Sequence, residues 1–198
     1  MRSTDKKNLK GEKGAFTLIE MVVSLSIIVM VTALFIANYH SANKRTDIIM
    51  TAQNLVADMH LAQNNTLGLV KYNDAVPAGG WGLAFNVNQD YYTLFADLDA
   101  PGTSGYMSMD AATEANPDYG GRITRLPQGI TISKLTTTGS TTNDAVNVTF
   151  LPPDPRTNIY RVAAAATSTA LEIELKEAQN NSIKTIRVNF LGLVEVLD

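Results

Sequence analysis

The sequence predicts an α+β protein, in which a long N-terminal α-helix packs on a β-rich antiparallel head and the first half of the helix spans a membrane. No Gly or Pro occurs in the 53 residues from Ala15 to Leu67, which permits one continuous helix. After Gly68 the sequence changes to short segments of alternating apolar and polar residues separated by turn residues, a pattern typical of antiparallel strands. The chain of 198 residues has no cysteine, which excludes disulfide scaffolds, thiolate zinc sites and cysteine nucleophiles.

Charge is unevenly distributed along the chain. Residues 1–15 contain five basic and two acidic residues, a net charge of +3, so residues 16–198 carry −6 of the overall charge of −3. A short basic segment before an acidic body is typical of a targeting sequence, and the acidic body disfavours nucleic-acid binding by bulk electrostatics. We therefore interpret residues 1–15 as a leader peptide that is cleaved.

The next 22 residues, Phe16–Ala37, are apolar except for a few hydroxyl residues and one charge, Glu20. As a helix they would be about 33 Å long, enough to cross a hydrocarbon core of about 30 Å. More positive residues lie before the segment than directly after it, so residues 1–15 should stay cytoplasmic and the head should emerge outside. A buried helix of a soluble protein and a secretory signal peptide are the alternatives, but the run is longer than a signal peptide's apolar region of about 7–15 residues.

Glu20 requires a partner, because an ionised carboxylate in a membrane helix costs a few kcal/mol when nothing pairs with it. In the intact chain Lys13 is the nearest upstream cation. If the chain is cut before Phe16, the new α-amino group, from the same subunit or a neighbour, becomes a candidate partner. We expect Glu20 to be an assembly residue that pairs with such a free terminus.

The residues Gly14-Ala15-Phe16-Thr17-Leu18-Ile19-Glu20 resemble the processing site of type IV prepilins and type II secretion pseudopilins. This resemblance implies that a membrane aspartyl peptidase, the prepilin peptidase, cleaves between Ala15 and Phe16 and methylates the new N-terminal Phe16. It also implies that the helices then bundle into a filament. The family usually has Gly directly before the cut, where this sequence has Ala15. Ala is small enough for a tight peptidase subsite, so cleavage is expected, at a lower rate.

The resemblance further implies a pilin-like fold and a structural role as a minor pilin or pseudopilin of a type IV pilus or type II secretion pseudopilus. Residues 51–67 resemble the minor pseudopilin H and FimT-type minor pilin group. The implied partners are the prepilin peptidase, other subunits, the inner-membrane assembly platform and the lipid bilayer. The implied location is the bacterial inner membrane, crossed once, with the head outside the cytoplasm.

Residues 38–70 are expected to continue the helix with an amphipathic pattern. One face carries small and medium apolar residues at spacings of 3 and 4, which suits packing on a sheet better than a coiled coil does. This stripe consists of Ile48, Ala52, Leu55, Met59, Ala62 and Thr66.

Residues 71–198 are expected to form the β-rich head as two small antiparallel sheets behind the helix. The alternating patterns predict strands near residues 81–87, 91–96, 122–126, 130–135, 146–150, 171–175, 186–190 and 194–196, with a hairpin loop at residues 88–90. Residues 101–121 and 136–144 are rich in small and polar residues and are expected to be loops that make contacts.

The best candidate for a ligand site in the head is Asp97 and Asp99, which precede a turn rich in glycine, with Asp110 beyond. Alternate carboxylates of this kind can bind Ca²⁺, the one cofactor the sequence suggests. Pro101 stands where a third carboxylate would be expected, however, so a turn in which both aspartates cap backbone N–H groups is the competing interpretation. No nucleophile elbow or phosphate loop is found, so the sequence predicts no enzyme.

A membrane-tethered receptor, for DNA uptake or for another ligand, is the alternative function. It would need clustered Lys and Arg residues, whereas those of the head are dispersed among more acidic residues. Only Arg122 and Arg125 on one predicted strand could form a small patch.

Overall fold

The computed structural model describes residues 16–138, 140–151 and 156–197, with the backbone alone for residues 37–43. Two compact units divide the chain, Met1–Ser41 and Ala42–Asp198. A single helix, α1 (Leu18–Leu67, 50 residues), contributes its first half to one unit and its second half to the other. The predicted uninterrupted helix is thus confirmed for its described length. The leader, with Lys13 and Ala15, lies outside the described residues.

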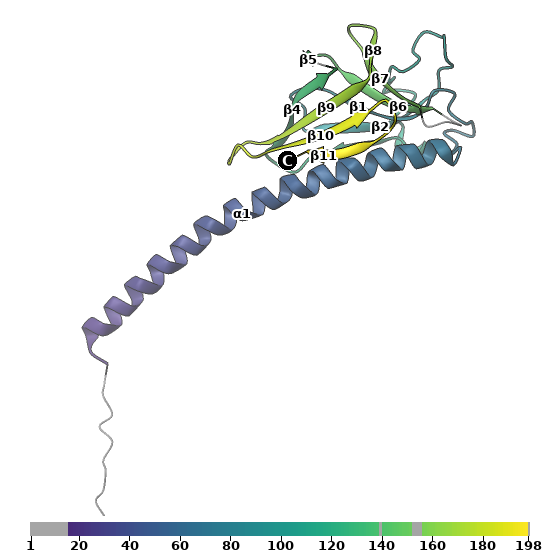
Figure 1. The fold of residues 1–198 in the computed structure, drawn as a ribbon. Helices are drawn as coiled ribbons and strands as arrows, with labels where there is room; N and C mark the ends of the chain where they lie inside the picture. The colour runs from purple at the N-terminus through teal and green to yellow at the C-terminus, as the bar shows by residue number, and fades with distance from the viewer. Residues whose placement is uncertain (1–15, 139, 152–155, 198) are drawn as a thin grey trace, which may run out of the picture. The chain divides into compact units, whose positions relative to one another are not determined.

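The second unit contains two antiparallel sheets (Figure 1). One has six strands, in the order β3 (Arg122–Arg125), β2 (Tyr91–Asp97), β1 (Gly80–Phe85), β6 (Val146–Leu151), β7 (Arg156–Arg161) and β8 (Ala166–Ser168). The other has five, in the order β11 (Val194–Leu197), β10 (Ile183–Asn189), β9 (Ala170–Glu177), β4 (Ile130–Thr137) and β5 (Ser140–Thr142). A short 3₁₀ helix, η1 (Pro117–Tyr119), lies between β2 and β3 in the chain.

One hydrophobic core joins the second half of α1 to both sheets. Each of the six predicted stripe residues of the helix is at most 2% exposed, and the five apolar ones belong to the same core cluster as the strand residues. Burial of each larger side chain stabilises the fold by about 1.5–3 kcal/mol. The amphipathic pattern in the sequence therefore identified the buried face of this helix correctly.

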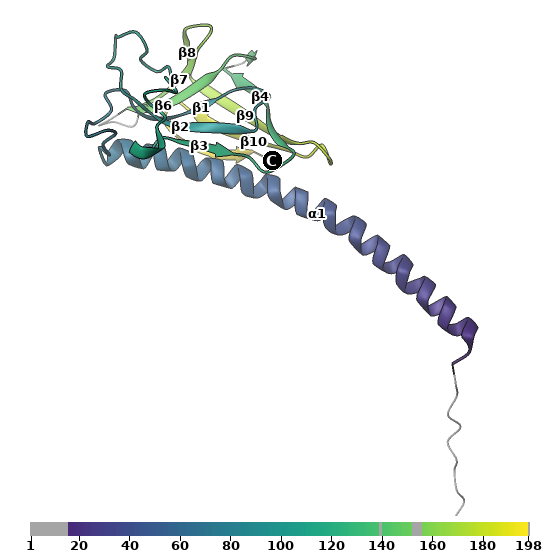
Figure 2. The same cartoon turned by 180° about the vertical axis from the view of Figure 1, so that it is seen from behind.

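Polar contacts fix the helix to both sheets along the same length. Arg122 on β3 forms an ion pair with Asp58 of α1, and the Tyr92 hydroxyl donates to the second Asp58 oxygen at 2.8 Å. On the other side, the Gln63 side-chain amide donates to the carbonyl of Gly192, in the turn between β10 and β11, at 2.6 Å. Since β3 and β11 are edge strands, α1 covers one edge of each sheet (Figure 2).

The central strands of the six-stranded sheet are buried on both faces, which their alternating sequence did not predict. All residues of β1 and all but one of β2 are buried. Part of the segment 101–121 covers the outer face, where Ala84 and Phe95 pack against Ala115 and Met109. Apart from η1, this segment is a loop as expected, but one that closes a second, smaller core.

Three strands lie where none was predicted. Residues 136–144, expected to be a loop, contain the end of β4 and all of β5, because Thr136 and Thr137 pair with Thr141 and Ser140. Strands β7 and β8 were also missed, since their residues lack a regular apolar alternation. Backbone hydrogen bonds pair β7 with β6 and β8 with β7.

A left-handed residue ends α1. The Leu69 N–H donates to the Thr66 carbonyl (3.1 Å) and the Val70 N–H to the Asn65 carbonyl (2.9 Å), the two hydrogen bonds of a Schellman motif. This motif places Leu69 at φ 51°, a conformation that favours glycine and costs other residues about 1–2 kcal/mol.

We predict that Leu69→Gly raises the free energy of unfolding by about 1 kcal/mol, because it relieves this strain at a side chain that is already 53% exposed. Chemical denaturation of the full chain in detergent micelles measures the change. Leu67→Gly is a matched control: Leu67 is equally exposed but helical, so the same replacement should lower stability by a similar amount. If both replacements raised the free energy of unfolding, or both lowered it, the left-handed conformation of Leu69 would be contradicted.

Candidate functional site

The first half of α1 is apolar and exposed on all sides. The stretch Leu18–Ile36 is long and apolar enough to cross a membrane, and none of its residues is buried against the rest of the described chain. Phe16 and Leu18 are 75% and 83% exposed. Such a surface is unfavourable in water and is compatible with a segment that crosses a bilayer.

Hydroxyl side chains within this segment are satisfied by the helix itself. Ser24 donates to the Glu20 carbonyl, Ser26 to the Val23 carbonyl and Thr32 to the Ile28 carbonyl, each at 2.7 Å. Polar groups with partners on their own backbone can enter a bilayer at little cost. Glu20 is the exception, because its carboxylate has no ion-pair partner among the described residues.

Glu20 also occupies the first turn of the helix. The Thr17 hydroxyl accepts a hydrogen bond from the Glu20 N–H (3.3 Å), as an N-cap does, and the helix begins at Leu18. A carboxylate in the first turn interacts favourably with the helix dipole. The sequence Thr17-Leu18-Ile19-Glu20 has the spacing of a capping box, a signal that sequence reasoning overlooked.

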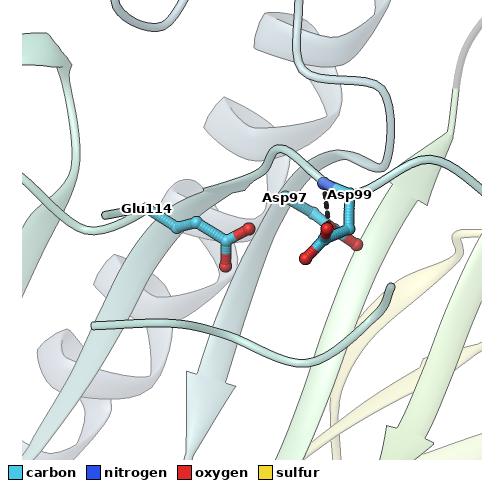
Figure 3. Close-up of side chains that lie close together, drawn as sticks. All are labelled: Asp97, Asp99 and Glu114. Atoms are coloured by element: carbon cyan, nitrogen blue, oxygen red, sulfur yellow. Dashed lines mark hydrogen bonds between the residues drawn. The ribbon is translucent and has the colours of Figure 1, made fainter. Parts of the chain in front are cut away.

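In the second unit, three carboxylates meet at the end of β2 (Figure 3). Asp97, Asp99 and Glu114 each place an oxygen within 4.8 Å of the others. Asp97 is the last residue of β2 and is fully buried, and Glu114 is 2% exposed. The structure thus brings Asp97 and Asp99 together and adds Glu114, which the sequence did not single out.

The acidic cluster (Asp97, Asp99 and Glu114) organises the segment that covers the six-stranded sheet. Asp97 accepts hydrogen bonds from the N–H groups of Asp99 (3.0 Å) and Met107 (2.7 Å). Glu114 accepts from the N–H groups of Leu98 (2.9 Å) and Asp110 (2.7 Å). Each buried carboxylate therefore joins two separate stretches of backbone, as in the capping interpretation of Asp97.

Tyr72 fixes the backbone around Glu114 through two hydrogen bonds of its hydroxyl group. The Tyr72 hydroxyl donates to the Thr113 carbonyl (2.7 Å) and accepts from the Asn116 N–H (2.8 Å), which fixes the residues on both sides of Glu114. Its ring packs edge-on against Trp81 on β1. Burial raises the pKa of the Tyr72 hydroxyl, so it remains a donor at neutral pH.

Burial and the charges of neighbouring acids raise the pKa of two members of the acidic cluster, Asp97 and Glu114. Desolvation raises the pKa of Asp97 to about 7, with the charges of Glu114 and Asp99 adding to the shift and the two backbone donors opposing it. Desolvation likewise raises the pKa of Glu114. The three residues offer only oxygen ligands, the donor set that Ca²⁺ prefers, and each oxygen that accepts one hydrogen bond keeps a second lone pair. Either a proton or a divalent cation bound by these three residues would relieve the repulsion.

The two arginines that could have formed a basic patch each lie near an acid, Arg122 in a close ion pair and Arg125 in a loose one. Arg122 forms an ion pair with Asp58, and Arg125 lies 3.7 Å from Asp90. The Asp58 carboxylate also accepts from the Thr124 and Tyr92 hydroxyls. Arg122 therefore connects β3 to α1. Its charge is balanced by that of Asp58, so it contributes little to the binding of a polyanion.

Comparisons of the chain with protein-family models, with curated proteins and with solved structures found no match. The functional interpretation therefore rests on the residues themselves.

We predict that the acidic cluster makes the second unit less stable as the pH rises. A carboxyl group whose pKa is raised to about 7 in the folded state contributes stability below pH 4, and this contribution is lost as the pH rises through 7. The free energy of unfolding of the wild type, relative to Asp97→Asn, should fall by about 1–3 kcal/mol between pH 4 and pH 8.

Chemical denaturation at both pH values tests this, with Asp118→Asn, an exposed carboxylate of the same segment, as the control that should show no such change. If the free energy of unfolding of the wild type, relative to that of Asp97→Asn, rose with pH, the proposed repulsion within the acidic cluster would be contradicted. A bound cation replaces the proton, so a calcium-dependent gain at pH 8 that is absent from Asp97→Asn would identify a metal centre.

Proposed function

We propose that this chain is a structural subunit, a minor pilin or pseudopilin, that enters a type IV pilus or type II secretion pseudopilus through its N-terminal helix. The single observation that carries the proposal is the exposed apolar segment Leu18–Ile36, whose first turn contains one carboxylate, Glu20, without a counter-ion among the described residues. The resemblance of residues 14–20 to prepilin processing sites supports it. An α+β architecture with a long N-terminal helix and two antiparallel sheets is compatible with a pilin-like fold.

Packing of apolar helices provides adhesion between subunits in this proposal. Apart from Glu20 and three hydroxyl residues, the side chains of residues 18–36 are apolar on every side of the helix, so they pack equally well against lipid tails or other helices. For the same reason they do not define one axial position of a subunit relative to its neighbours. A polar contact must supply that register.

The carboxylate of Glu20 supplies the register by pairing with a free amino terminus. After cleavage before Phe16, the new α-amino group and the Glu20 carboxylate are both costly when unpaired in an apolar bundle. An incoming subunit removes both penalties at the one offset that brings its terminus to the Glu20 of a neighbour. Phe16 and Thr17 precede the helix, and Phe16 is exposed, so the cleaved end is sterically free to make this contact.

A DNA-uptake receptor is the less supported alternative. Phosphate binding requires unpaired Lys and Arg side chains. The candidate residues Arg122 and Arg125 each lie beside a carboxylate. A membrane-tethered receptor would also use the apolar segment, but binding DNA gives no role to Glu20, whereas the structural role explains both.

We predict that Glu20→Gln leaves membrane insertion intact and lowers incorporation into filaments at least about ten-fold, because each incoming terminus then remains unpaired. Quantifying the subunit in the membrane and in sheared filament fractions measures both steps.

Two neighbouring variants separate pairing from capping. Thr17→Ala removes the cap at a cost of about 1 kcal/mol but keeps the charge, and Ser24→Ala removes a hydroxyl that is satisfied within its own helix. Both should assemble nearly as the wild type does. Wild-type incorporation of Glu20→Gln, or an equal loss in Thr17→Ala, would overturn the pairing mechanism.

We also predict that the mature membrane-bound protein begins with N-methylated Phe16. Intact mass and N-terminal sequencing measure this directly, and Ala15→Gly should be processed faster because Gly is the residue usual before the cut. A mature protein that starts at Met1 or near Asn43 would contradict the proposed pathway.

A further inference from the structure

The edges of the two sheets that α1 does not cover enclose a cleft lined by hydroxyl side chains. Strand β8 ends the six-stranded sheet and β5 ends the five-stranded sheet. In both views β8 lies on the side of the sheets away from the helix (Figures 1 and 2). The cleft between these edges has a volume of about 280 Å³ and is lined by Thr137, Thr138, Ser140, Arg161, Thr167 and Ser168, together with Thr169. We refer to it as the hydroxyl cleft.

Hydrogen bonds across the hydroxyl cleft hold its walls in place. The Thr138 hydroxyl, at the end of β4, lies 2.6 Å from the Ser168 hydroxyl and 2.9 Å from that of Thr169. The Thr138 N–H also donates to Ser168 Oγ (3.1 Å). A cleft held in this way loses little conformational freedom when a ligand binds. The Thr167 hydroxyl has no hydrogen-bond partner in the described part of the chain and is available to a ligand.

Arg161 brings a weakly neutralised positive charge to the cleft. Its register partner on β6 is Val146, a core residue, so its side chain leaves β7 on the inner face of the sheet. The guanidinium makes one long contact, 3.4 Å from Nη2 to Asp144 Oδ2. Its Nε is buried and has no hydrogen-bond partner among the described residues. Donor capacity therefore remains on a cation that is only partly exposed.

A second hollow adjoins the hydroxyl cleft and also combines threonine hydroxyls with one arginine. This hollow, about 340 Å³, shares Thr138 and Thr169 with the cleft and is lined further by Thr136, Ala170, Glu172 and Arg187. The Arg187 guanidinium is 3.9 Å from both Glu172 and Glu195, beyond hydrogen-bonding distance. Two arginines, each loosely paired, thus lie on either side of a shared ridge of threonine hydroxyls.

We propose that the hydroxyl cleft binds an acidic polysaccharide, with the carboxylate of one sugar at Arg161 and the next sugar across the Thr138 ridge toward Arg187. Ser and Thr hydroxyls both donate and accept hydrogen bonds, as sugar hydroxyls do, and a guanidinium matches the planar geometry of a carboxylate. No aromatic side chain is among the described residues that line either hollow, so recognition depends on hydrogen bonds and charge, which favours a charged sugar.

Nucleic acid fits the same surface less well. Binding of a phosphate backbone draws on a row of cations, whereas Arg161 and Arg187 are the two cations among the described residues that line the hollows. The polysaccharide site shares no residue with α1. The polysaccharide proposal can therefore be wrong while the filament proposal is right, and the reverse.

Calorimetric titration of the full chain tests the proposal, in micelles of a detergent without a sugar headgroup. The probe is an oligogalacturonate, and its fully methyl-esterified form is the neutral counterpart. We expect the acid form to bind, the ester at least about ten-fold more weakly, and Arg161→Gln to lose about ten-fold in affinity for the acid form. Thr167→Val, an isosteric change at an exposed position, should lose a few-fold.

Arg125→Gln is the matched control, because Arg125 lies on β3 at the opposite edge of the sheet and is 74% exposed at its side chain. It should bind the probe as the wild type does, and thermal unfolding verifies that each variant is folded. Absence of binding, equal binding of the ester, or unchanged affinity in both Arg161→Gln and Thr167→Val would overturn the proposal. So would competition by a DNA oligonucleotide, or by sulfate at the same concentration, with the same dependence on Arg161.

Discussion

The burial of one face of α1 against the edges of two sheets is the contact on which the second unit depends. Without the helix, β3 and β11 would be open edges, and the core side chains between the sheets would face water. The buried stripe closes that opening, and Asp58 and Gln63 bind one sheet each. The same helix has no apolar partner over residues 18–36 in the described chain. One uninterrupted element therefore meets two different environments, and the change in its pattern near Lys44 marks the transition.

The helix could be predicted from the sequence because its signal is local. Absence of Gly and Pro, and apolar residues at spacings of 3 and 4, are properties of consecutive residues, and the predicted stripe is the buried face. Strands β1, β2, β4, β6, β9, β10 and β11 follow from local alternation in the same way. Strand β7 does not, since only Thr157 and Ile159 are buried there and the strand is defined by its pairing with β6. Pairing between distant segments leaves little trace in a single sequence.

The acidic cluster shows the same limit at a site. The sequence indicated Asp97 and Asp99 as a possible site because they are two residues apart. Glu114 lies beside them only because the loop that carries it is held by hydrogen bonds to Tyr72. The tyrosine lies before β1 and the glutamate after β2, so nothing in their spacing indicates that they meet. Gly79 contributes as well, because its missing side chain leaves space for the buried Asp97 carboxylate. The chemistry of the cluster therefore arises from packing rather than from a motif.

The carboxylates of this chain have different roles, and the surroundings of each carboxylate determine its role. Glu177 is buried, yet its pKa is lowered, because the N–H groups of Asn180 and Gln179 donate to its carboxylate. Asp97 has equivalent backbone donors, but desolvation by burial, together with the charges of two acidic neighbours, raises its pKa. Glu20 has a helix N-terminus and an apolar surface around it, and no cation within the described residues. The Thr17 hydroxyl caps the backbone N–H of Glu20 and leaves its carboxylate to be solvated by water. In the proposed filament, packing the helix among others would remove this water and make a positively charged partner necessary, and we propose that the terminus freed at Phe16 provides it.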